Sequence, residues 1–239
     1  MAGHTAVMIV GVGPGLGRAL ARRFAETGHP IAIAARTEAT LASIASEIKE
    51  AGGVALPLAY DVSDDLALAG AIGRVESQLG PIGTLVYNAG NQVRGGIPEL
   101  SPQDFAAAWR VGPYGAFLHA RRLLPKMAAQ GGGVMLFTGA TSSVHAPAKS
   151  PAFASAKFAL RGLAMSLMRE WGPQGVHIAH VLVDGVILRP QSQAEGGNPP
   201  DFLRPADIAD AYYQLAMQPP SAWSFELDLR PYTDGYLEN

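Results

Sequence analysis

The chain has 239 residues, of which 48% are hydrophobic and 16% are charged. This length and composition predict a single folded domain that spans residues 1–239. Eighteen basic and twenty acidic side chains give a net charge of −2, which argues against a nucleic-acid-binding protein, since such proteins carry clustered basic surfaces. The chain has no cysteine, so disulfides, thiolate metal sites and cysteine nucleophiles are excluded.

The apolar runs of the sequence are short. None approaches the roughly 18 to 20 residues that a helix needs to span a bilayer. The first residues lack the basic region of a signal peptide and soon become glycine-rich. We therefore expect a cytoplasmic protein that has no membrane segment, and we expect no metal site.

Strand-like and helix-like segments alternate along the chain. Continuous apolar runs indicate buried parallel strands, and apolar residues three or four positions apart indicate helices. The expected strands are 5–10, 31–34, 54–60, 84–87, 134–137, 177–183 and 224–229. The expected helices are 15–27, 38–51, 66–79, 102–129 with a kink at Pro113, 152–171 and 206–217. This order predicts an α/β fold, a doubly wound domain whose seven-stranded parallel sheet has helices on both faces.

The first expected strand runs directly into a glycine-rich turn. Gly11, Gly15 and Gly17 have the spacing G-x-x-x-G-x-G, and Gly13 and Leu16 lie between them. Glycine lets the backbone turn sharply and approach a phosphate, and the amino end of the following helix favours an anion. The position between a strand and a helix predicts a dinucleotide site. The alternative is a tight turn without a ligand.

Two polar residues follow the next two expected strands. Arg36 stands where an acidic residue would hold a ribose 2′-hydroxyl, and an arginine can instead pair with a 2′-phosphate. The sequence therefore favours NADP(H) over NAD(H), the alternative being a solvated arginine. Asp61, followed by Val62, either accepts a hydrogen bond from the adenine amino group or caps the next helix.

Further motifs connect this pattern to a known family. Asn88-Ala89-Gly90 follows the fourth expected strand, and Lys157 lies in a later helix. With the glycine turn and Asp61-Val62, these motifs resemble the short-chain dehydrogenase/reductase family over residues 5–189. The resemblance implies a Rossmann-type fold, a homodimer or homotetramer, and hydride transfer between NAD(P)(H) and a small carbonyl or alcohol. The cofactor contacts that it implies, beyond the glycine turn, are Asn88, Ala89, Gly90, Lys157, Asp184, Gly185 and Val186.

The family's proton-transfer residues are missing at their usual positions. The family tyrosine, four residues before the lysine, is Phe153 here. The family serine falls on Ala140 and the family asparagine on Gly112. A phenylalanine ring has no proton to donate, and a positioned general acid contributes typically about 10²- to 10⁴-fold to the rate. Reduction is therefore expected to be slowed unless another group donates the proton.

Three residues are candidates for the altered chemistry. Lys157 can donate a proton directly, although in the family it also holds the nicotinamide ribose. Ser142, one of three hydroxyl residues after Ala140, can orient a substrate oxygen or belong to a polar loop. Asp184 stands where the family has a proline, and it can bind the nicotinamide amide, act as a base or cap the next turn.

The sequence therefore predicts an NADP(H)-dependent oxidoreductase with a non-standard proton donor. Two alternatives are a catalytically silent NADP(H)-binding regulatory protein, and a non-redox isomerase or lyase with Asp184 or His145 as base. The polar, glycine- and proline-rich segment 189–204 is expected to be a mobile substrate loop. The alternation of Phe225, Leu227 and Leu229 with acidic residues predicts an edge strand or a subunit contact.

Overall fold

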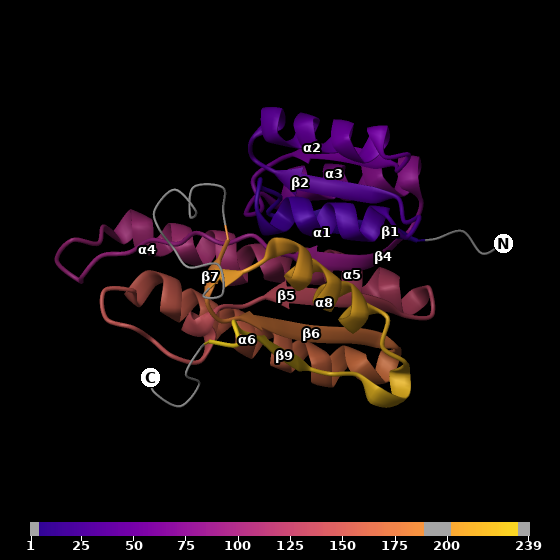
Figure 1. The fold of residues 1–239 in the computed structure, drawn as a ribbon. Helices are drawn as coiled ribbons and strands as arrows, with labels where there is room; N and C mark the ends of the chain where they lie inside the picture. Colours follow the sequence, from indigo (N-terminus) through magenta and orange to yellow (C-terminus); the bar gives the residue numbers. More distant parts are fainter. Residues whose placement is uncertain (1–4, 189–201, 234–239) are drawn as a thin grey trace.

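The computed structural model describes residues 5–188 and 202–233. Seven parallel strands form one sheet in the order β3-β2-β1-β4-β5-β6-β9 (Figure 1). The chain starts at the centre of the sheet, winds to one edge, and then returns to build the other half. The doubly wound parallel sheet is confirmed. The strands are β1 (Ala6–Val10), β2 (Ile31–Ala35), β3 (Ala55–Ala59), β4 (Ile82–Tyr87), β5 (Gly133–Thr138), β6 (Val176–Val183) and β9 (Glu226–Leu229).

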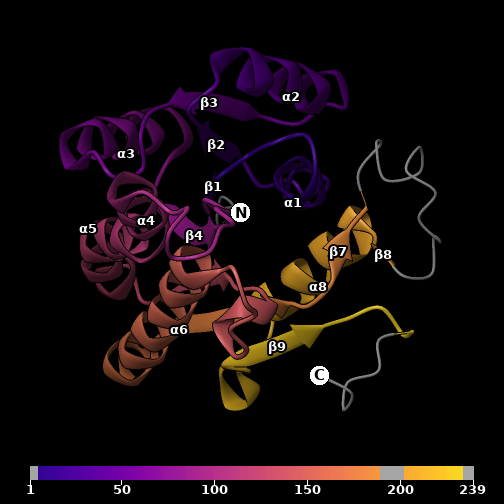
Figure 2. The same ribbon diagram turned by 90° about the vertical axis from the view of Figure 1, so that its left-hand side faces the viewer.

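Helices cover both faces of the sheet, as Figure 2 shows from its edge. Each face buries its own apolar cluster, because strands covered on both sides are apolar on both sides. One face packs against α1 (Leu16–Ala25), α2 (Glu38–Glu50) and α8 (Pro205–Ala216). The other face packs against α3 (Asp65–Leu79), α5 (Gly115–Ala129) and α6 (Pro151–Trp171). No helix within residues 5–188 and 202–233 is both long and apolar enough to cross a bilayer.

The expected helix 102–129 is interrupted near its middle. It consists of α4 (Pro102–Trp109), a π-helical turn (Arg110–Tyr114) and α5. Pro113 has no N–H to donate, and Gly112 takes non-helical angles of φ −78° and ψ −105°. The buried Tyr87 hydroxyl donates a 2.6 Å hydrogen bond to the Val111 carbonyl in this turn. The kink expected at the proline is therefore confirmed, and a core tyrosine supports it.

Two short strands escaped the sequence pattern. β7 (Val186–Ile187) and β8 (Phe202–Leu203) form a separate two-stranded parallel sheet, which is too short to produce a periodic signal. Of the expected loop 189–204, residues 189–201 lie outside the described residues, and Arg204 is the N-cap of α8.

β9 lies at the edge of the large sheet, which confirms the edge-strand prediction. Leu227 and Leu229 pack against the cluster that α1 and α8 cover. Phe225 precedes the strand and packs against the opposite cluster, so it does not share a face with the two leucines.

Candidate functional site

The glycine turn after β1 has no room for a side chain at two positions and has open space at two others. Gly11 has a φ of +86°, and a Cβ there would lie 2.4 Å from the Ala89 nitrogen. A Cβ on Gly17 would lie 2.6 Å from a Cα within the same turn. By contrast, a Cβ on Gly13 or Gly15 would meet no atom within 4 Å. The first two glycines are thus required by the chain itself, while the other two leave room beside the helix.

The amino end of α1 has the properties of an anion site. Its N-cap residue, Gly15, has no side chain to cap the helix, and the first turn contains no acidic residue. The first N–H groups of a helix lack internal partners, and the peptide dipoles place partial positive charge there. The open space beside Gly15 therefore fits a dinucleotide diphosphate. Leu16 is buried in the core, so only its backbone can meet such a ligand.

The loop after β4 closes against this turn. The Asn88 side-chain amide donates a 2.9 Å hydrogen bond to the Gly11 carbonyl. Ala89 is buried against the turn, and Gly90 is exposed. The structure therefore brings the two cofactor motifs of the sequence together.

Two charged side chains mark the ends of β2 and β3. Arg36 is exposed just after β2. Asp61 accepts hydrogen bonds from the backbone N–H and the hydroxyl of Ser63, both 2.8 Å to Oδ1. These bonds, and to a lesser extent the charge of Arg36, hold the pKa of Asp61 below its usual range. The cap of α3 is Asp64, which accepts from two backbone N–H groups, so the alternative that Asp61 caps this helix is wrong. Val62 is a core residue.

Lys157 lies in a dry environment between three elements. Its Nζ donates a 2.6 Å hydrogen bond to the Thr138 carbonyl at the end of β5. A Cβ on Gly90 would lie 3.6 Å from the same nitrogen. The Nζ also lies 5.5 Å from the centroid of the Phe153 ring, one helical turn earlier on α6. Burial lowers the pKa of Lys157 to about 8, because the charged ammonium loses its water.

The three hydroxyl residues after β5 form a short 3₁₀ turn (Thr141–Ser143). Ser143 is fully buried, and its Oγ accepts a 3.1 Å hydrogen bond from the Ala140 N–H. Ser142 is also buried, at 6% exposure. Thr141 is half-buried, and is thus the most exposed residue of this turn. The sequence pointed to Ser142 for a substrate contact, and Thr141 beside it is the more exposed residue.

Asp184 is buried at the end of β6 and has two partners. Its Oδ1 accepts a hydrogen bond from the Thr141 hydroxyl, and its Oδ2 forms a 2.6 Å ion pair with Arg230. Arg230 follows β9 and also pairs with Asp228. Sequence reasoning missed both Thr141 and Arg230 as partners of this acid, because one lies in the turn after β5, the other follows β9, and no local pattern connects them with Asp184.

The remaining candidates are dispersed. Gly185, with a φ of +141°, and the exposed Val186 lead from β6 into β7. His145 is exposed on a loop, and Tyr114 is 47% exposed on the π-helical turn. A Cβ on Gly112 would meet Ala156 at 3.5 Å, an ordinary contact distance.

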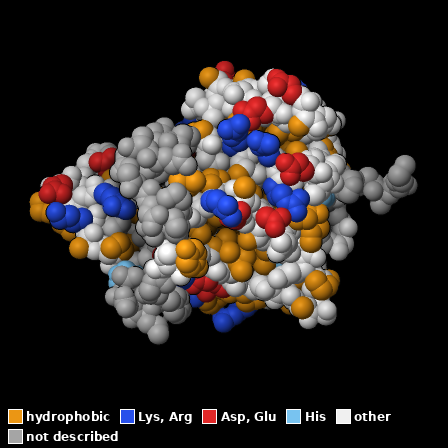
Figure 3. Space-filling view, in the orientation of Figure 1, with side chains coloured by type: hydrophobic (Ala, Val, Ile, Leu, Met, Phe, Trp, Pro, Cys, Tyr) orange, Lys and Arg blue, Asp and Glu red, His pale blue; other side chains and the backbone are white. Residues whose placement is uncertain are grey.

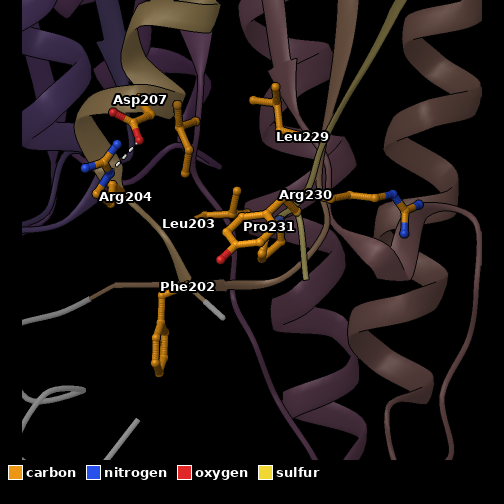
Figure 4. Close-up of a pocket in the computed structure, with 9 residues that line it drawn as sticks. Phe202, Leu203, Arg204, Asp207, Leu229, Arg230 and Pro231 are labelled. Carbon is orange, nitrogen blue, oxygen red and sulfur yellow. Dashed lines mark hydrogen bonds and ion pairs between the residues drawn. The ribbon is translucent and has the colours of Figure 1, made fainter. Parts of the chain in front are cut away.

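A pocket of about 360 Å³ adjoins the Asp184 cluster (Figure 4). Its wall is mainly apolar, with the ion pair between Arg204 and Asp207 on one side. Arg230 belongs to this wall, but its side chain points away from Leu203. Hydrophobic side chains also gather near the middle of the face in Figure 3, over α8. The pocket residues are Phe202, Leu203, Arg204, Asp207, Ile208, Leu229, Arg230, Pro231 and Tyr232.

Comparison with known proteins agrees with this geometry. Residues 5–191 match the family described as short chain dehydrogenase. The chain belongs to this family. A short chain dehydrogenase of Pseudocercospora fijiensis is 34% identical over 210 residues, which cover 85% of this chain and 64% of that relative. The chain thus spans less than two thirds of that relative's length.

Solved structures of other dehydrogenases share the fold. One from Rhodopseudomonas palustris has a TM-score of 0.84 and 32% identity, covering 95% of this chain and 99% of the other. An alcohol dehydrogenase of Thermococcus sibiricus, complexed with 5-hydroxy-NADP, has a TM-score of 0.86 and 26% identity, covering 97% and 98%. The chain is therefore a member of an oxidoreductase family.

Proposed function

We propose that this short-chain dehydrogenase is an NADP(H)-dependent oxidoreductase that acts on a small carbonyl or alcohol, with Lys157 as the proton donor. The observation that carries the proposal is the buried Lys157 ammonium, 5.5 Å from the centre of the Phe153 ring. It lies beside the Asn88–Gly90 loop, which closes against the glycine turn. A proton source and a dinucleotide site thus share one end of the sheet.

The side chains around the turn suit a phosphorylated dinucleotide. The amino end of α1 holds the diphosphate, and the exposed Arg36 pairs with the 2′-phosphate. Asp61 accepts from the adenine amino group through Oδ2, because both bonds from Ser63 go to Oδ1. The NADP analogue in the Thermococcus sibiricus relative supports this preference.

When bound, the cofactor supplies or accepts the hydride. Lys157 holds a proton at Nζ at neutral pH, because its pKa is about 8. One of its three N–H bonds goes to the Thr138 carbonyl, which leaves two for ligand oxygens. In reduction the ammonium donates a proton to the substrate oxygen, and in oxidation the neutral amine accepts one. The lowered pKa brings this acid close to working pH, where general acid catalysis is most effective.

The pH–rate profile tests the role of Lys157. We expect kcat for carbonyl reduction to decrease above about pH 8, as Lys157 loses its proton. Lys157→Met should remove this decrease together with most of the rate, about 10²-fold or more. Wild-type activity in Lys157→Met, with the same pH profile, would contradict the assignment.

Arg36→Ala tests the cofactor preference. Loss of a charge-assisted hydrogen bond should weaken NADPH binding by about 10- to 100-fold and leave NADH binding unchanged. Arg74→Ala, an exposed arginine on α3, is the matched control. Calorimetric titration measures both affinities. Equal weakening of the two cofactors would refute the 2′-phosphate assignment.

A second candidate is a protein that binds NADP(H) without turnover. The residues at the family's tyrosine, serine and asparagine positions favour this candidate. They are Phe153, Ala140 and Gly112, and none of them can exchange a proton. Tight NADPH binding without oxidation of the cofactor by any carbonyl would support it. An isomerase or lyase would instead show turnover without net change in cofactor absorbance.

We also propose a cytoplasmic homodimer or homotetramer. Large aromatic side chains are exposed on neighbouring helices that cover one face, which suits a protein contact. They are Phe105, Trp109, Phe117 and Phe158. Light scattering at micromolar concentration measures the mass, and a monomer would contradict the proposal.

A further inference from the structure

Two chains of paired side chains run from the edge strand β9 to the turn after β5. β6 and β9 pair in parallel, with His180 opposite Glu226 and Val183 opposite Leu229. Residues at alternate positions of a strand share one face. The side chains of His180 and Asp184 therefore point the same way, and so do those of Glu226 and Arg230. Both chains of contacts therefore lie on the α6 face of the sheet, and both end on the Thr141–Ser143 turn.

The first chain fixes the backbone of the turn. Arg161 on α6 donates two hydrogen bonds to Glu226, at 2.7 and 2.8 Å. Glu226 lies 2.8 Å from His180 Nδ1, and His180 Nε2 lies 3.2 Å from Ser143 Oγ. A neutral ring satisfies both contacts, with Nδ1 donating to the carboxylate and Nε2 accepting from the hydroxyl. Ser143 also accepts from the Ala140 N–H and is fully buried, so it holds the turn and does not reach a ligand.

The second chain orients the hydroxyl of Thr141, the most exposed residue of the turn. Arg230 pairs with Asp184 at 2.6 Å, and Asp184 accepts the Thr141 hydroxyl proton. A hydroxyl has a single proton, so Thr141 Oγ1 offers a ligand only its lone pairs. Thr141 is half-buried, whereas both serines of the turn are buried.

We infer that Thr141 is a specificity-determining residue that accepts a hydrogen bond from a hydroxyl group of the substrate, with Asp184 and Arg230 as its positioning residues. The inference rests on the proposed function and narrows its substrate class to hydroxyl-bearing carbonyl compounds and the corresponding diols. A carbonyl oxygen only accepts hydrogen bonds, so it cannot pair with Thr141. The carbonyl oxygen pairs with the Lys157 ammonium, and a neighbouring substrate hydroxyl pairs with Thr141.

The test compares ketones that differ only in this hydroxyl. Hydroxyacetone and butanone exchange a hydroxyl for a methyl group of similar size, and larger hydroxyketones with their methyl analogues extend the series. The ratio of kcat/KM within each pair is measured for wild type, Thr141→Val and Thr141→Ser, with NADPH as cofactor. Comparing this ratio between wild type and each variant cancels the difference in intrinsic reactivity between the two ketones. Thr40→Val, the same exchange at a half-buried threonine on α2, is the control.

We expect wild type to favour the hydroxyketone, and Thr141→Val to reduce this preference by about 10- to 100-fold, the effect of one hydrogen bond. Thr141→Ser should retain it, and Thr40→Val should not change it. Asp184→Asn should also lose the preference, and the double variant with Thr141→Val should lose no more than either alone, because Asp184 acts through Thr141.

Several results would overturn the inference. Equal loss of activity toward both ketones in Thr141→Val would assign the residue a structural role. A wild-type enzyme that turns over ketones with no preference within any pair would also contradict it. NADPH binding is titrated in parallel. If wild type does not bind NADPH, or reduces no ketone, the proposed function fails as well. If it binds NADPH and reduces ketones without preference, only the role of Thr141 fails.

Discussion

Acidification should destabilise this protein through its buried histidines. His119 is fully buried on α5, where its Nδ1 donates to the Gly115 carbonyl and its Nε2 accepts from the Tyr60 hydroxyl, each at 2.7 Å. Burial lowers the pKa of His119 to about 4. Burial also lowers the pKa of His180 to about 4 and outweighs the carboxylate of Glu226 2.8 Å away. Both rings are therefore neutral in the folded protein above this pH.

The sign and size of the effect follow from proton linkage. Between pH 6.5 and about 4, the unfolded chain binds a proton at each of these histidines and the folded chain does not. The free energy of unfolding therefore decreases as the pH falls through this window. From pH 7 to pH 5, each histidine should remove about 2 kcal/mol, or about 4 kcal/mol for the pair.

Urea unfolding followed by tryptophan fluorescence at pH 5, 6 and 7 measures this loss. His119→Gln removes one titrating ring, so we expect it to reduce the loss between pH 7 and pH 5 by about 2 kcal/mol. His145→Gln, the same exchange at an exposed histidine, should keep the wild-type pH dependence. The same acid sensitivity in His119→Gln and wild type would refute the linkage argument.

Three further predictions test the site and its support. Phe153→Tyr restores a phenol one turn before Lys157 and should raise the rate of NADPH oxidation by about 10²-fold; an unchanged rate would favour the silent-binding alternative. Gly139→Ala places a Cβ 2.3 Å from Nε2 of the buried His180 and should destabilise by about 2 to 3 kcal/mol in urea titrations. Gly70→Ala, in open space within α3, should instead stabilise by about 0.5 to 1 kcal/mol, and similar results for both glycines would contradict the clash. The lowered pKa of Lys157 means that wild-type stability should rise by about 1 kcal/mol between pH 7 and pH 9, because only the folded chain releases this proton in that range. Lys157→Met should lack this rise, and a rise of equal size would show that another group causes it.

Local sequence was sufficient for the fold and for the position of the glycine turn between β1 and α1. The strand β1, the turn from Gly11 to Gly17 and the helix α1 are consecutive, so their periodicity and glycine spacing can be read without knowing any distant contact. The same holds for the kink at Pro113, because the missing N–H is a property of the residue itself. The two-residue strands β7 and β8 escaped detection, because two residues carry no period.

Only the tertiary structure showed which side chains surround Lys157 and Asp184. Ser142, the serine favoured from the sequence, is buried, and Thr141 beside it is accessible. Asp184, which follows β6, accepts the Thr141 hydroxyl proton, and Arg230, which follows β9, pairs with Asp184. Register and strand order bring these residues together, and neither is encoded in any local stretch. The lowered pKa of Lys157 likewise depends on burial that several distant elements create together.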